Sequence, residues 1–194
     1  MGKPNRRVEI ALTALCDELD WGLRCFYAAQ AAAQMPGAAV LAETFQRACN
    51  DQSLLTLARM VLATENARRD ESINIRYLAN LVKGKPSAVR FGDAEDVEAL
   101  IEKQVRMLEE HAPLIAALKE QRDRSLAHLD RHHVNDPGWR QPYFGVDKAQ
   151  VEALYLGLAE ILNAYHRLIF GAERRFDQWE SQARAEAQLF CRLD

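Results

Sequence analysis

The stretch DKAQVEALYLGLAEILNAYHRLIFG (residues 147–171) has the clearest structural pattern in this chain of 194 residues. Its large apolar side chains recur at steps of three and four residues, which is the period of one face of an α-helix. Asp147 can cap the start of this helix with its carboxylate, and Gly171 can end or kink it. The pattern therefore predicts a helix over about 148–170 with one face in a core.

The same helical period runs through almost all of the remaining sequence, and no segment alternates as a strand would. Prolines, glycines and short polar residues mark the boundaries. We expect helices over 8–34, 38–65, 73–82, 94–130, 148–170 and 172–190, with a loop at 131–146. The second helix is expected to be interrupted near Asp51 or Ser53, and the third to be capped by Ser72. The fourth is opened by Asp93 and broken near Pro113. This order predicts an all-α bundle of five to six helices in a single domain over 1–194, with 172–190 as an added C-terminal helix.

Composition and charge are those of an ordinary globular protein, with 48% hydrophobic and 27% charged residues. A net charge of −3 argues against a basic coat for nucleic acid but is compatible with a local phosphate site. Acidic residues interrupt the N-terminal apolar positions, so we expect no signal peptide, and no apolar run predicts a membrane span. The four cysteines form no CxxC pair and suggest thiols of a reducing compartment, so we expect a cytoplasmic protein.

An arginine interrupts one of the apolar stripes. The stripe passes through Ile115 and Leu118 and continues at Leu126 and Leu129, which places Arg122 on the side expected to face the core. An arginine in such a position extends its charged end to solvent, pairs with a carboxylate or binds an anion.

Arg122, Ser125 and His128 follow one another at steps of three residues along a single row of the expected helix. The row spans about 9 Å at the helical rise per residue, a distance that a long arginine side chain can bridge. Arginine and histidine beside one groove can hold a phosphate and transfer protons near neutral pH. The same residues also suit an ordinary helix end, where they satisfy the last carbonyls and the helix dipole. Both interpretations stay open at this point.

Two neighbouring features also have a functional and a structural interpretation. His128 and His132 are spaced as in many zinc or nickel pairs, and His133 lies beside them. No further cluster completes a site, so we expect no metal and no cofactor. Trp139, Arg140 and Tyr143 in the following loop can stack on bases or plug the end of the bundle. We favour the plug for Trp139.

The residues RDRSLAH (122–128) resemble the signature of the HEPN superfamily, in which a histidine follows an arginine after four to six residues. A polar residue usually follows the arginine, and Asp123 occupies that place here. A second pair with similar spacing, Arg106 and His111, has Met107 in the polar place and lies before the proline break, so it fits less well.

Two longer segments resemble the abortive-infection U branch of the same superfamily. LLTLARMVLATENARRDESINIRYLANLV (54–82) is similar to the middle of that branch, where an LAR helix precedes a polar break and a short helix. RDRSLAHLD (122–130) is close to its R-N-x-x-x-A-H-x-D form, with aspartate replacing the commoner asparagine. The resemblance covers about 10–170 and does not include the last helix.

The resemblance implies a metal-independent endoribonuclease that works as a homodimer, with the two arginine–histidine motifs facing each other. In that scheme His128 transfers protons at the ribose 2′-OH and the leaving oxygen, and Arg122 stabilises charge on the phosphate. Asp123 would orient one of these residues or the RNA. The expected substrate-binding residues are Arg124, Ser125, Arg131, Arg140 and Tyr143.

Other members of the superfamily bind nucleotides, RNA or partner proteins without catalysis, and this alternative stays open. Six basic and five acidic residues between positions 119 and 148 leave a formal charge of +1, which does not indicate a long RNA footprint. The expected partners are RNA or a nucleotide, a second copy of the chain and an antitoxin protein, with no membrane.

Overall fold

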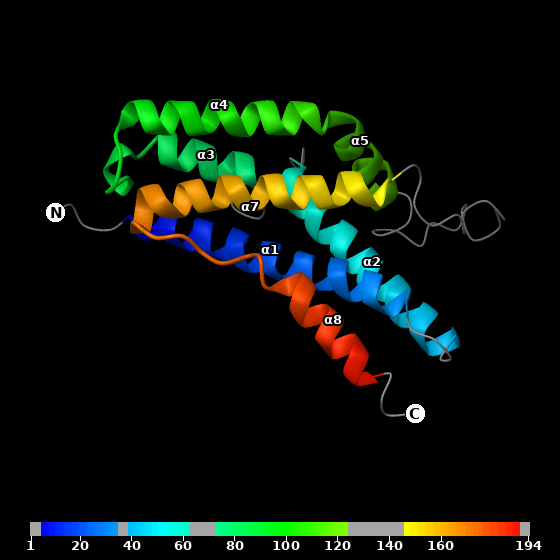
Figure 1. Cartoon of the computed structure of the whole chain (residues 1–194). Coiled ribbons are helices and arrows are strands. Elements are labelled where there is room, and N and C mark those ends of the chain that lie inside the picture. Colours follow the sequence, from blue (N-terminus) through cyan, green and yellow to red (C-terminus); the bar gives the residue numbers. More distant parts are fainter. Residues whose placement is uncertain (1–4, 35–38, 63–72, 124–145, 191–194) are drawn as a thin grey trace.

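The computed structural model describes residues 5–34, 39–62, 73–123 and 146–190. These ranges contain seven α-helices, one short 3-10 helix and no strand, which confirms the all-α prediction (Figure 1). The elements are α1 (Arg6–Ala32), α2 (Ala39–Val61), α3 (Ile75–Lys83), η1 (Pro86–Ala88), α4 (Ala94–Glu110), α5 (Ala112–Gln121), α7 (Lys148–Phe170) and α8 (Trp179–Phe190). The expected break near Pro113 separates α4 from α5. None of the helices in these ranges has both the length and the apolar character needed to cross a membrane.

Helices α1 and α7 pack against each other along the bundle and carry much of its core (Figure 1). α7 buries the whole stripe on which its prediction rests, from Val151 to Ile169. α2 and α8 pack against α1, whereas α4 packs against α3, α5 and α7. Burial of this apolar surface is the main driving force for folding, at roughly 25 cal/mol for each Å² removed from water.

Several helix ends follow the chemistry of their cap residues. Asp93 and Asp96 cap each other's backbone N–H groups at the start of α4. The Asp147 side chain accepts the Ala149 N–H at the start of α7. Gly171 ends α7 in the left-handed conformation, with a φ of 73°. The predictions for Asp93, Asp147 and Gly171 are therefore confirmed.

Two predicted features of α2 and α3 are wrong. α2 continues without interruption through Asp51 and Ser53, because the Ser53 side chain is buried and bonded to α7 instead of capping a new helix. The N-cap of α3 is Asn74 rather than Ser72, and the Asn74 side chain accepts the Tyr77 N–H at 2.9 Å.

The last helix begins at Trp179, later than predicted, because the segment before it binds α1. Arg174 forms ion pairs with Asp17 and Asp20 of α1. Trp179 Nε1 donates a hydrogen bond to Asp20 Oδ1 at 2.9 Å. The Arg174 backbone N–H is also satisfied, by the Asn163 side chain of α7 at 3.0 Å. These contacts hold the chain in an extended course before α8 begins.

A tight contact joins α1, α2 and α7. The buried Tyr155 hydroxyl of α7 donates to the Ser53 carbonyl oxygen at 2.8 Å and lies 2.9 Å from the Ser53 hydroxyl. A Cβ atom on Gly22 of α1 would lie 2.4 Å from Tyr155 Oη and 2.8 Å from Thr56 Cγ2. Glycine at position 22 therefore leaves the space that the phenol occupies. Burial raises the pKa of Tyr155, so its hydroxyl stays a neutral donor.

Replacing Gly22 by alanine is expected to lower the free energy of unfolding by about 2 kcal/mol, because the new methyl group overpacks the core. Gly157→Ala in α7 is the matched control. Its new methyl group meets the flexible Met107 side chain, and removal of a helical glycine stabilises by roughly 0.5–1 kcal/mol. Urea unfolding followed by circular dichroism compares the two variants. Equal stability of both would contradict the close three-helix contact.

Candidate functional site

The predicted site begins at the end of α5, so the placement of this helix determines the placement of the site. Pro113 lies in the first turn of α5, where its missing N–H is not needed, and the helix starts directly after His111. Leu114, Leu118 and Gln121 are buried, and α5 packs against α2. This packing holds the C-terminal end of α5 against the bundle.

Arg122 lies beside the buried face of α5, which corrects its predicted core-facing position. Ile115, from which that stripe was traced, is only half-buried, whereas Leu114 and Gln121 are 3% exposed. Position 121 therefore faces the core in place of position 122. The Arg122 side chain is 23% exposed and reaches the surface.

The carboxylate of Asp123 holds the guanidinium of Arg122. Nε and Nη2 of Arg122 lie 2.8 Å and 2.6 Å from Asp123 Oδ1. Both residues belong to a π-helical turn that follows α5, a geometry that is frequent at functional sites. Two of the five N–H groups of the guanidinium are thus directed at Asp123. An arginine oriented in this way suits a bound oxyanion such as a phosphate.

The other residues predicted for the site lie outside the described ranges. They are Arg124, Ser125, His128, Arg131, Arg140 and Tyr143, together with His132, His133 and Trp139 of the alternative interpretations. The structure brings Arg122 and Asp123 together. The predicted row from Arg122 to His128 stays a prediction.

The beginning of α7 lies at the same end of the bundle as the end of α5 (Figure 1). A pocket of about 100 Å³ at the beginning of α7 is lined by Phe26, Asn50, Ser53, Leu54, Val146, Lys148 and Val151. It is smaller than the roughly 300–1,000 Å³ of a typical small-molecule site. Asn50 and Lys148 could not be recognised as pocket residues from the sequence, because they are distant in the chain and meet only in the folded bundle.

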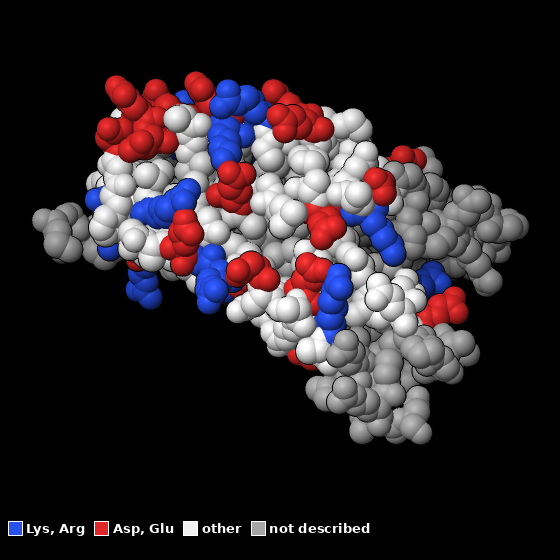
Figure 2. Space-filling model, viewed as in Figure 1, with Lys and Arg blue, Asp and Glu red and all other residues white. Residues whose placement is uncertain are grey.

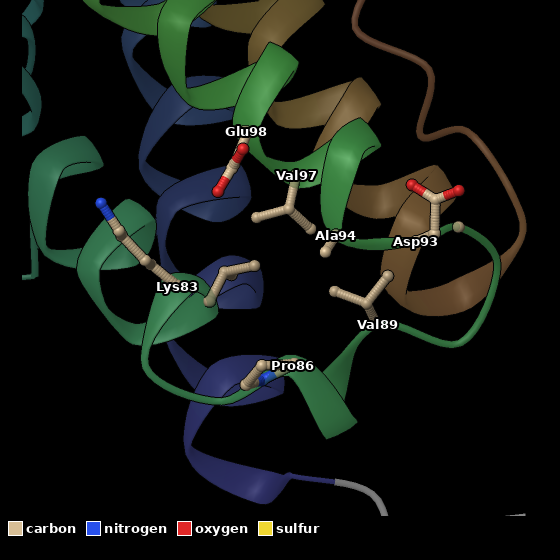
Figure 3. Close-up of a pocket in the computed structure, with 9 residues that line it drawn as sticks. Lys83, Pro86, Val89, Asp93, Ala94, Val97 and Glu98 are labelled. Carbon is tan, nitrogen blue, oxygen red and sulfur yellow. The ribbon is translucent and has the colours of Figure 1, made fainter.

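A larger pocket, of about 300 Å³, lies where α3, η1 and the beginning of α4 meet (Figure 3). Val89 and Val97 point into the hollow, whereas the charged ends of Lys83 and Asp93 are turned away from it (Figure 3). The Asp93 carboxylate is also engaged in capping α4. The pocket lies at the end of α4 that is remote from α5 (Figure 1). It is therefore separate from the Arg122 site, and its lining favours apolar contact over acid–base chemistry.

Arg106 and His111, the second arginine–histidine pair, line a pocket of about 250 Å³ between α4 and α7. Lys103 and Glu160 in the same pocket form an ion pair at 2.5 Å, and Glu110 adds another carboxylate. The carboxylates offset the charge of the basic groups in this pocket, as Asp123 does for Arg122. This pair is therefore a suitable internal comparison for the Arg122 site.

Charged residues of both signs are interspersed over the face shown in Figure 2, where the described residues form no continuous basic strip. This distribution agrees with the net charge of −3. Attraction of nucleic acid to this face has to be local, because the sequence-independent part of such binding grows with the number of basic contacts. No group of three or more histidine, cysteine, aspartate or glutamate side chains in the described part of the chain is placed to hold a metal ion.

The helical fold, with an arginine–carboxylate pair at the end of α5, fits a HEPN-type helical domain. The family model described as AbiU2 (HEPN_AbiU2) matches residues 8–190, and the chain belongs to this family. The match extends beyond the 10–170 indicated by the sequence resemblance and includes α8. No curated protein and no solved structure matches the chain.

Arg122→Ala and Asp123→Asn are expected to change the free energy of unfolding by less than about 1 kcal/mol, because a partly exposed ion pair contributes little. Leu118→Ala, one turn earlier and 1% exposed, is expected to cost about 2–5 kcal/mol. Urea unfolding followed by circular dichroism compares the three variants. If Arg122→Ala lowered the free energy of unfolding as much as Leu118→Ala does, the arginine would be identified as a structural residue.

Proposed function

We propose that the chain is a metal-independent endoribonuclease of the abortive-infection type, which cleaves RNA through the ribose 2′-OH at a site shared by two copies. The observation that carries the proposal is membership of the AbiU2 family over residues 8–190. The Arg122–Asp123 pair at the surface end of α5 supports it further, because it provides an oriented cation six residues before His128 in the sequence.

In this mechanism His128 removes the proton of the 2′-OH while the 2′ oxygen attacks the adjacent phosphorus. The bond from phosphorus to the 5′ oxygen breaks, and the leaving oxygen receives a proton. The products are a 2′,3′-cyclic phosphate and a 5′-hydroxyl. Arg122 stabilises the negative charge that develops on the phosphate oxygens. Asp123 orients the guanidinium before RNA binds, so less ordering is needed in the transition state.

A second copy of the chain completes the site in this proposal. Cleavage needs one group that removes a proton and one that donates a proton, whereas a single motif contains one histidine. Two motifs that face each other supply both imidazoles and two guanidinium groups. Cytoplasmic RNA would be held by Arg124, Ser125, Arg131, Arg140 and Tyr143. An antitoxin protein that covers this site is a further proposed partner.

Cleavage of RNA by the purified full-length protein in EDTA tests the proposal. Wild type is expected to leave 2′,3′-cyclic phosphate ends, identified by mass spectrometry. Arg122→Ala and His128→Ala are each expected to lower the cleavage rate at least about 100-fold, because each removes one half of the proposed site. Arg106→Ala and His111→Ala are the matched controls, since this pair has similar spacing in the sequence, and both should cleave as wild type does.

Equal cleavage by wild type, Arg122→Ala and His128→Ala would overturn the proposed mechanism. Binding of RNA or nucleotide without cleavage, lost in both variants, would instead identify a catalytically silent binding module. Cleavage that EDTA abolishes would favour a metal site that includes His128 and His132.

Asp123→Asn is expected to cleave RNA within about tenfold of the wild-type rate, because the amide oxygen can still accept a hydrogen bond from Arg122 Nε. Asp123→Leu has a similar size but no acceptor, and it should lose more activity. Single-turnover measurements with saturating protein separate the chemical step from RNA binding. Equal single-turnover rates for the two variants would show that Asp123 does not position the arginine.

A further inference from the structure

Cys25 and Cys49 bring two thiols together across the contact between α1 and α2. Cys25 lies on α1 and is 6% exposed, whereas Cys49 lies on α2 and is half-buried. Both cysteines line the same pocket, and neither belongs to a disulfide. The pair therefore lies at an extensive helix–helix contact of the bundle.

A pocket of about 220 Å³ between α1, α2 and α8 contains both cysteines in its lining. Trp21 and Phe45, which also line it, are 48% and 51% exposed, so the pocket opens to solvent. Arg24 in the same lining lies over the Trp179 ring, with Cζ 4.7 Å from the ring centroid. A small neutral oxidant can enter the pocket through this opening.

The two thiols differ in acidity and in exposure. Donation from Cys25 stabilises the thiolate of Cys49 and lowers the pKa of Cys49. The same hydrogen bond, together with burial, raises the pKa of Cys25. On the same helix, burial raises the pKa of Cys16 to about 12. Cys49 is also the more exposed of the two, since it is half-buried and Cys25 is buried, so it is the thiol that an oxidant reaches first.

We propose that Cys25 and Cys49 form a peroxide-reactive dithiol that closes to a disulfide between α1 and α2. The Cys49 thiolate attacks one oxygen of hydrogen peroxide, the O–O bond breaks, and Cys49 becomes a sulfenic acid. The released hydroxide takes up the proton that Cys49 had lost. The sulfur of Cys25 then attacks the sulfur of Cys49, and the departing hydroxide takes the Cys25 proton. Two thiols and one peroxide thus give one disulfide and two water molecules.

The disulfide would tie together two helices on which other parts of the bundle rest. Formation of the disulfide requires the two sulfur atoms to approach to a bond of about 2.05 Å. The new cross-link restricts the unfolded chain and is therefore expected to raise the temperature of unfolding. Since α5 packs against α2, the cross-link also fixes the helix that supports Arg122.

Peptide mapping of the full-length protein tests this proposal. The reduced protein is freed of reductant, treated with hydrogen peroxide under native conditions, then denatured and alkylated with N-ethylmaleimide. The expected product is a pair of peptides joined through Cys25 and Cys49, with two hydrogens fewer than the separate reduced peptides. Cys16 should be recovered as an alkylated thiol, and dithiothreitol should restore both linked thiols.

Two variants distinguish the paired thiols from other oxidation. Cys16→Ser should form the same disulfide as wild type. Cys25→Ser should leave Cys49 as a sulfenic acid that dimedone traps, without an internal cross-link. Recovery of Cys25 and Cys49 as thiols in the same yield as Cys16 would overturn the proposal. A cross-link from Cys49 to Cys191 or to another molecule would overturn it as well. Both of these overturning outcomes are measured on the wild-type protein, so neither depends on the folding of a variant.

Discussion

The buried hydroxyl of Tyr155 is the constraint on which the arrangement of α1, α2 and α7 depends. An unpaired buried hydroxyl would cost about 1–3 kcal/mol, so Ser53 of α2 has to stay where it can bind this group. Position 22 of α1 also has to remain a glycine, because a side chain there would occupy the space of the phenol. These two requirements fix α2 against both other helices. α5 packs against α2, so the position of Arg122 depends on a tyrosine that lies outside the proposed site.

A second buried tyrosine fixes the other part of α7. Tyr165 donates to Gln104 Oε1 of α4 at 2.9 Å, and Gln104 Nε2 donates to the Ile75 carbonyl of α3 at 3.2 Å. Tyr155 and Tyr165 are ten residues apart, or about 15 Å along the helix, so α7 is held at two separate points. Apolar side chains alone tolerate sliding of one helix along another. A buried hydrogen-bond network is satisfied in fewer arrangements, and it selects one alignment of the packed helices.

Local chemistry explains which parts of the fold could be predicted from the sequence. The cap at Asp147 and the end at Gly171 depend on a few neighbouring residues, and both are confirmed. Ser53 has the side chain of a common helix cap, and only its contact with α7 explains why it lies inside a continuous helix. The predicted apolar stripe of α5 is displaced by one residue at its end, because a step of either three or four residues fits the helical period at each turn. Packing against α2 resolves that choice and buries Gln121 in place of Arg122.

The Asp123 carboxylate has two opposing effects on phosphate binding at Arg122. It orients the guanidinium, but it also offsets much of the positive charge, and the net charge of −3 supplies no compensating field. Long-range attraction is therefore a weak basis for RNA binding by a single copy. Short-range hydrogen bonds from an oriented arginine remain effective, because they are strong only at contact distance. A site shared by two copies, as proposed, would place two oriented guanidinium groups within contact distance of one phosphate.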